Sequence, residues 1–175
     1  LETTATTGSN YIDFNDADEN KAFIGLGGGS DDSLSIWNLK SDAVRIATNN
    51  LERMRLDSGG RLLVGTSTNQ QGTGALLQVA ATAGTAALSA NRYTNTADGP
   101  SRLYLFKSRG TSIGTQTIVQ DGDDIGEIVF HASDGTDATQ AALIRTEVDG
   151  TPGNNDMPGR LSFHTTADGA HTPTE

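Results

Sequence analysis

Several acidic residues of this chain stand close together in sequence, as the carboxylates of glycoside hydrolases must stand close in space. The pairs are Asp31-Asp32 and Asp123-Asp124, and Glu127 follows the second pair. Two carboxyl groups about 5–9 Å apart can flank a glycosidic bond as acid and as nucleophile or base. Acidic turns also supply such pairs by chance, because Asp is common and well solvated in turns. We therefore expect turn-forming carboxylates and no catalytic residue, with polysaccharide cleavage as the less favoured alternative.

Metal binding is the second chemistry that the residue types allow. The histidines are His131, His164 and His171. Three copies of one His around a threefold axis could form a three-nitrogen metal site, but no second ligand stands two residues from any of them. The other candidates, Asp121, Asp123 and Asp124, offer oxygen ligands for Ca²⁺, yet their spacing lacks the closing Glu of an EF-hand loop. We expect no metal site and no cofactor.

Ligand-binding signatures are sparse. Trp37 is the single Trp and could stack on a sugar, although a lone Trp in a strand more often packs in a core. Gly27-Gly28-Gly29 lacks both the GK[ST] ending and the following helix pattern of a phosphate-binding loop. The chain has 12 basic and 22 acidic residues with no Lys/Arg cluster, which argues against nucleic acid as a partner. There is no cysteine and no apolar run of about 18 residues, so we expect neither disulfides nor membrane insertion.

The elements that must position these residues are strands. Apolar residues recur at every second position along much of the chain, and a 3.6-residue period is almost absent. Asp-Gly pairs, which favour tight reversals, separate many of these runs. We expect strands at residues 11–14, 21–26, 33–39, 43–48, 53–57, 61–64, 76–79, 102–107, 125–131, 141–148 and 160–165.

A weak internal repeat indicates two units. The first series is Tyr11-Ile12-Asp13-Phe14, Ala22-Phe23-Ile24 and Leu34-Ser35-Ile36, and the second is Glu127-Ile128-Val129-Phe130, Ala142-Leu143-Ile144 and Leu161-Ser162-Phe163. We expect a first β-rich unit at 1–66 and a second at 101–175. Residues 67–100 form a connecting segment rich in Ala, Thr and Gly, which we expect to be extended rather than to hold a short helix at 80–90.

The composition predicts an assembly of several copies. Leu, Ile, Val and Phe number only 35 of 175 residues, and the net charge is −10, which places the chain near the border of disorder. The 23 Thr residues favour strands instead. Ordering the backbone costs about 1–2 kcal/mol per residue, and a chain this poor in large side chains recovers little of that alone. It is more easily stabilised by sharing a core with copies of itself.

One phrase resembles a known family. Residues 52–66, Glu-Arg-Met-Arg-Leu-Asp-Ser-Gly-Gly-Arg-Leu-Leu-Val-Gly-Thr, are similar to a motif that recurs in the shafts of bacteriophage tail fibres and tailspikes. Residues 105–110, 122–128, 134–136 and 148–161 resemble the same fibre region, and residues 165–175 read like the run-up to the phrase at 52–66. The chain is therefore expected to be a segment of a longer repetitive protein.

The resemblance implies a homotrimeric, β-rich stalk in a virion, assembled in the host cytoplasm. It further implies other tail or baseplate proteins as partners, and a downstream intramolecular chaperone domain of the endosialidase tailspike kind that is removed by self-cleavage. None of that domain's catalytic residues is carried over to this chain.

Together these observations predict an all-β fold of short antiparallel strands in two repeated units, intertwined as a homotrimeric fibre. The expected function is structural, in a tail fibre or spike that supports host attachment. The alternatives are a receptor-binding module for host glycan and a polysaccharide depolymerase. We expect the trimer core to be packed by apolar side chains facing inward: Phe14, Ile36, Met54, Leu56, Val64, Leu105, Phe130, Ile144 and Phe163.

Overall fold

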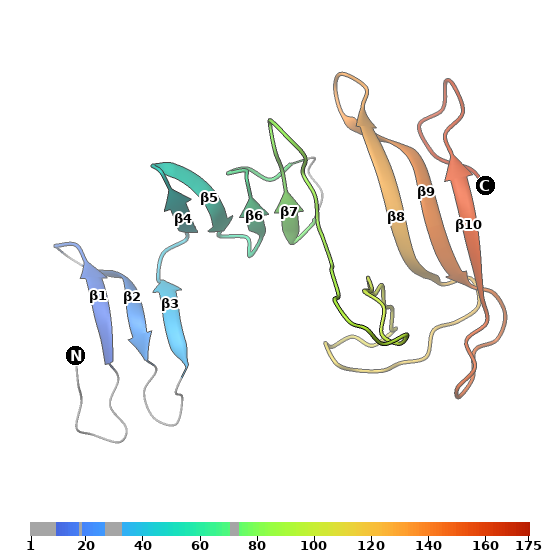
Figure 1. Ribbon diagram of the computed structural model, residues 1–175, viewed down its shortest axis with the longest axis horizontal. Helices are drawn as coiled ribbons and strands as arrows, with labels where there is room; N and C mark the ends of the chain where they lie inside the picture. Colours follow the sequence, from blue (N-terminus) through green and yellow to red (C-terminus); the bar gives the residue numbers. More distant parts are fainter. Residues whose placement is uncertain (1–9, 18, 27–32, 71–73) are drawn as a thin grey trace. The chain divides into compact units, whose positions relative to one another are not determined.

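The protein is an all-β chain that divides into two compact units. The computed structural model describes residues 10–17, 19–26, 33–70 and 74–175, and within these ranges it contains ten strands and no helix (Figure 1). Among the described residues there is therefore no helix that could span a membrane. The units are Leu1–Ser89 and Ala90–Glu175, and their boundary falls inside the connecting segment expected at 67–100. The pair Asp31-Asp32 lies outside the described residues.

The first sheet is an antiparallel meander of three strands. It consists of β1 (Asn10–Asn15), β2 (Asn20–Leu26) and β3 (Leu34–Asn38), in the order β1-β2-β3. The register places Ile12 opposite Ile24, and Ile24 opposite Ile36. Because side chains on opposed residues share a face, the three isoleucines form one row across the sheet.

The last sheet repeats this arrangement. It consists of β8 (Asp124–Ser133), β9 (Ala138–Val148) and β10 (Gly159–Thr165), with β9 in the centre. Ile128 lies opposite Ile144, which lies opposite Phe163. These three residues occupy the repeat positions of Ile12, Ile24 and Ile36, so the two series seen in the sequence correspond to two meanders with the same register.

The middle sheet has four strands and one parallel pair. Its strands are β4 (Val44–Thr48), β5 (Leu51–Leu56), β6 (Leu62–Val64) and β7 (Leu77–Val79), hydrogen-bonded in that order. A two-residue loop joins β4 to β5, and both its residues have left-handed φ angles, 52° at Asn49 and 57° at Asn50. Asn tolerates this conformation, which suits the tight hairpin.

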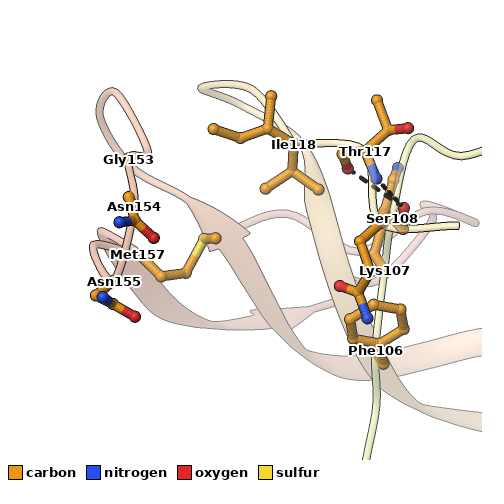
Figure 2. A pocket seen from close by; sticks show the side chains of 11 residues that line it. Phe106, Lys107, Ser108, Thr117, Ile118, Gly153, Asn154, Asn155 and Met157 are labelled. Atoms are coloured by element: carbon orange, nitrogen blue, oxygen red, sulfur yellow. Dashed lines mark hydrogen bonds between the residues drawn. The ribbon is translucent and has the colours of Figure 1, made fainter.

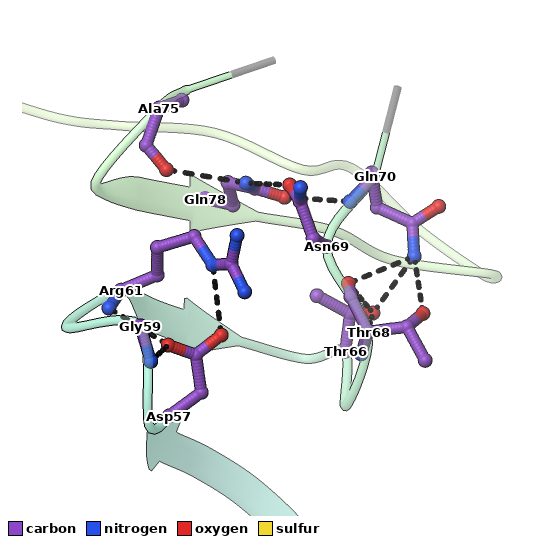
Figure 3. A network of polar contacts seen from close by, with 9 residues as sticks. All are labelled: Asp57, Gly59, Arg61, Thr66, Thr68, Asn69, Gln70, Ala75 and Gln78. Atoms are coloured by element: carbon purple, nitrogen blue, oxygen red, sulfur yellow. Dashed lines mark hydrogen bonds and ion pairs between the residues drawn. The ribbon is translucent and has the colours of Figure 1, made fainter. Parts of the chain in front are cut away.

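An aspartate holds the turn between β5 and β6. The Asp57 carboxylate accepts hydrogen bonds from the backbone N–H groups of Gly59 (2.9 Å) and Arg61 (3.0 Å), and from the Arg61 Nε (2.8 Å) (Figure 3). These donors hold the pKa of Asp57 below its ordinary value, the Arg61 backbone N–H having the largest effect. The turn of the fibre-like phrase is therefore fixed by its own Asp and Arg.

The connection from β6 to the parallel strand β7 is fastened by a glutamine. Gln78 of β7 accepts a hydrogen bond from the backbone of Gln70 (2.9 Å) and donates to Asn69 and to the carbonyl of Ala75 (3.2 Å) (Figure 3). Gln78 lies opposite Leu63, so both side chains are on one face of the sheet. The connection therefore closes that face, and Leu63 is fully buried there.

Ten of the eleven expected strands form, and the exception is residues 102–107. The structure assigns no strand between β7 and β8, so residues 80–90 are not helical and residues 102–107 are unpaired within the chain. The expectation of a strand at 102–107 is therefore wrong for the single chain. A strand needs a partner for its ladder, and no described segment of the same chain supplies one.

A substitution at Gly65 tests how closely the chain after β7 packs against the end of β6. The φ of Gly65 is +75°, and a methyl group at its Cα would lie 2.1 Å from the carbonyl oxygen of Ala80. The backbone N–H of Ala80 donates a hydrogen bond to the carbonyl of Val64. We expect Gly65→Ala to lower the unfolding free energy by more than the roughly 1–2 kcal/mol of a left-handed alanine. Gly60→Ala, at φ +77° in open space, is the control. Equal losses in urea unfolding of the two variants would contradict the steric argument.

Candidate assembly interface

Each of the three sheets carries large apolar side chains on one face, which we call its open face. In the first sheet this face holds the row Ile12, Ile24 and Ile36, with the pair Leu26 and Leu34 beside it. Their exposed fractions run from 39% at Ile24 to 69% at Leu34. The opposite face carries an aromatic cluster, in which Phe23 stacks on Trp37 with 5.8 Å between ring centroids and lies 5.5 Å from Tyr11. Trp37 therefore packs on a neighbouring ring, although its side chain is still half exposed.

The open face of the second sheet is a regular apolar array. Two rows cross all four strands, one of Val44, Leu56, Leu62 and Leu77 and the other of Ile46, Met54, Val64 and Val79. Leu56 and Leu77 are about half exposed, whereas Leu63 on the other face is completely buried. The chain thus covers the face of this sheet that carries Leu63, and it leaves uncovered the face that carries the two apolar rows.

The third sheet has the same asymmetry. Ile128, Ile144 and Phe163 form a row on its open face, and Phe130 lies beside them. The other face is polar at its centre. There the Arg145 Nε donates to Glu127 at 2.6 Å, and the hydroxyl of the buried Ser162 lies 2.8 Å from the His164 Nε2.

All nine apolar residues expected from the sequence to pack a shared core map to the open faces. Phe14 and Ile36 belong to the first sheet, Met54, Leu56 and Val64 to the second, and Phe130, Ile144 and Phe163 to the third. Leu105 reaches the third face from the connection, because a methyl group at Gly126 would lie 2.7 Å from its Cβ. Their packing against other copies stays a prediction.

The buried apolar residues within the single chain are different ones, and sequence reasoning missed them. Among the described residues they are Leu63, Val119, Leu143 and Val148. Leu63 and Leu143 alternate with open-face residues, so a period-two pattern alone could not tell which face the chain itself covers. The signal that could have been used is Gln78, whose polar side chain fastens the covering connection.

Large apolar side chains are exposed on all three sheets. Among the described residues, Ile12, Leu34, Ile36, Leu56, Phe130 and Phe163 are each between 48% and 69% exposed. Contiguous apolar patches of this kind mark interaction surfaces.

Within the described residues, the acidic residues considered for catalysis, Asp123, Asp124 and Glu127, lie beside arginines. Arg109 donates two hydrogen bonds of 2.7 Å to Asp123, which also accepts one from the backbone of Gln120. Arg109 is the main reason that the pKa of Asp123 lies well below its ordinary value of 3.8. Glu127 bonds Arg145, and Asp124 lies 3.6 Å from the same guanidinium. These carboxylates fix the entry to β8, and an arginine lies beside each of them.

The residues considered as metal ligands are not brought together. Asp121 accepts a hydrogen bond from the backbone of Gly150 (2.7 Å), while Asp123 faces Arg109. His131 lies opposite Gln140 with its Nδ1 3.2 Å from the carbonyl of Ala138. In the described part of the chain no three His, Asp, Glu or Cys side chains gather as a metal site would require.

The second unit contains a hollow lined by both apolar and polar side chains. Phe106, Ser108 and Ile118 lie on one side of it, and Asn154 and Met157 on the other (Figure 2). The Ser108 hydroxyl is already engaged, because it accepts hydrogen bonds from the backbone N–H groups of residues 110 and 117. Asn154 and its neighbour at position 155 present their amides from the tip of a tight turn. The hollow could hold a small polar ligand, and it contains no catalytic constellation.

Comparison with known proteins finds a likeness in fold. No protein-family model matches the chain, and no curated protein shows a significant match. The structure is similar to the carboxy-terminal domain of the bacteriophage T5 L-shaped tail fibre, with a TM-score of 0.52 and 13% sequence identity. The match covers 96% of this chain and 72% of that chain. At this identity the likeness shows a shared fold.

The Asp123–Arg109 pair predicts an acid-sensitive fold. The folded state depresses the pKa of Asp123, so its stabilisation is complete above its ordinary pKa of 3.8 and is lost as the pH falls further. We expect Asp123→Asn to lower the urea midpoint at pH 7 and to flatten its decline between about pH 5 and pH 2.5. Arg109→Gln, which removes the main cause of the depressed pKa of Asp123, should flatten the decline in the same way. Parallel slopes for the wild type and Asp123→Asn would contradict the assignment.

Proposed function

We propose that this chain is a structural segment of a bacteriophage tail fibre, and that three copies assemble by packing their open faces together. The observation that carries the proposal is the uncovered apolar face on all three sheets, and these faces together carry eight of the nine residues named above. A lone chain would leave these rows in water, whereas a closed symmetric oligomer buries the same patch in every copy. The tail-fibre fold supports the same role.

The proposed role is mechanical and needs no chemistry from the segment. Shared cores and short turns resist bending, so the segment would hold a distal receptor-binding tip away from the particle and transmit attachment. Other tail or baseplate proteins would be its neighbours in the virion. The proposal includes a downstream chaperone domain of the endosialidase type, as the resemblance of the sequence implies. Such a domain would align three chains before their cores close.

Binding of a host glycan by the segment itself is the second candidate. It is favoured by the hollow in Figure 2, where Asn154 and Asn155 offer amides that hydrogen-bond to no described residue, beside exposed apolar carbon of Met157. A glycan array with the assembled protein tests it. A hit that the double variant Asn154→Ala and Asn155→Ala abolishes would support binding at this place, while release of oligosaccharide in a reducing-end assay would point to a depolymerase.

Assembly is tested by one substitution on an open face and one beside it. Ile12 is on the open face, and Asp13 is its neighbour on the other face, where it accepts a hydrogen bond from Asn20. A lysine buried without a partner costs several kcal/mol, and a trimer would bury three. Light scattering should give the wild type a mass near three times 18.2 kDa, Ile12→Lys a mass near 18.2 kDa, and Asp13→Lys the wild-type value.

A folded wild-type monomer would contradict the proposal. Because the Ile12 side chain is already 55% exposed in the single chain, Ile12→Lys should still show the β-sheet circular dichroism of a folded chain. If Ile12→Lys shows neither the trimer mass by light scattering nor the β-sheet circular dichroism, the chain folds only as it assembles. That result also agrees with an obligate oligomer.

A further inference from the structure

Residues 102–107 have the composition of a strand, and no strand in the described part of the chain pairs with them. They read Arg-Leu-Tyr-Leu-Phe-Lys, a run rich in the aromatic and branched residues that favour strands. Leu103, Tyr104 and Phe106 are between 71% and 77% exposed. Among the described residues, none makes a hydrogen bond to the backbone of this segment. A β-forming segment thus lies open on its backbone and on most of its side chains.

The segment is nevertheless held at one end. Leu105 packs on Gly126, whose bare Cα admits it, and Gly126 shares the open face of Ile128. Two residues after the segment, the backbone N–H of Arg109 donates a hydrogen bond to the carbonyl of Thr117 (3.2 Å). The guanidinium of Arg109 donates to the carboxylate of Asp123. Residues 102–107 are therefore positioned beside the open face of the third sheet, and they are not a free linker.

We propose that residues 102–107 complete a β-strand only in the assembly, by pairing with a strand edge of a second copy of this chain. This inference rests on the proposed assembly and names a segment that would exchange backbone hydrogen bonds between copies. A neighbouring copy would receive an added strand, and the apolar side chains of the segment would extend the interface that begins at Leu105.

A second copy is the occupant that the observations favour. The segment is continuous with the open face of the third sheet through Leu105 and Gly126, so whatever covers that face also meets the segment. Strand edges remain available in each copy, since β8 is the outer strand of its sheet along ten residues. An unpaired edge is a template for pairing with another chain, which natural proteins normally cover.

Hydrogen–deuterium exchange of the assembled protein tests the pairing, with its mass checked on the same sample. We expect peptides covering residues 102–107 to exchange on the order of a hundredfold or more slowly than the loop at 112–114, which holds the fully exposed Ile113, because exchange must first break the pairing. In Ile12→Lys, dissociated into single chains, the protection of 102–107 should disappear while that of β9 persists.

The outcomes separate this inference from the proposed function. An assembled protein in which residues 102–107 exchange as fast as residues 112–114 would overturn the pairing and leave the assembly intact. Protection that survives in dissociated Ile12→Lys would also overturn it, because the partner would then be the same chain. A wild-type protein of 18.2 kDa would instead remove the proposed assembly, and the pairing with it.

Discussion

The structure depends on sheets that each leave one apolar face uncovered by the chain itself. Polar and aromatic contacts within the chain cover or stiffen one face, as with Leu63 under the connection fastened by Gln78. The other face carries rows of isoleucine, leucine and phenylalanine that the chain leaves in water. Burying apolar area is the main favourable term in folding, at about 25 cal/mol per Å². In the proposed assembly, these faces would be buried by contacts with other copies of the chain, and the proposed role in a fibre rests on that burial.

Polar contacts within the chain fix turns and strand ends in two of the three sheets. Asp57 binds its own turn and Arg61, Asp123 binds Arg109, and Arg145 binds Glu127 across two strands. Exposed ion pairs contribute little stability on average, but those made with backbone donors and bidentate geometry fix local conformation. The charged residues therefore hold turns and strand ends in place, and they leave the apolar rows aligned.

The sequence predicted the strands well because their signal is local. Period-two alternation and Asp-Gly turns identify ten strands, and the repeat of Ile12, Ile24 and Ile36 by Ile128, Ile144 and Phe163 reappears as two meanders with one register. Residues 102–107 are a continuous apolar and aromatic run between Arg102 and Lys107, with a composition that favours strands, and they form no strand in the single chain. Such a run reports the capacity to pair, and it does not identify the chain that supplies the partner.

The amino-acid sequence by itself determined the all-β class, the turns and the set of apolar residues that share a face, because these follow from residue-by-residue geometry. Only the tertiary structure decided which face the chain covers for itself. That choice depends on where the connection between β6 and β7 crosses, and on which carboxylate each arginine reaches. Arg109 and Asp123 are 14 residues apart across an irregular segment, and no period in the sequence links them. Contacts between distant residues arise from the path of the whole chain, so they become visible only when the chain is folded.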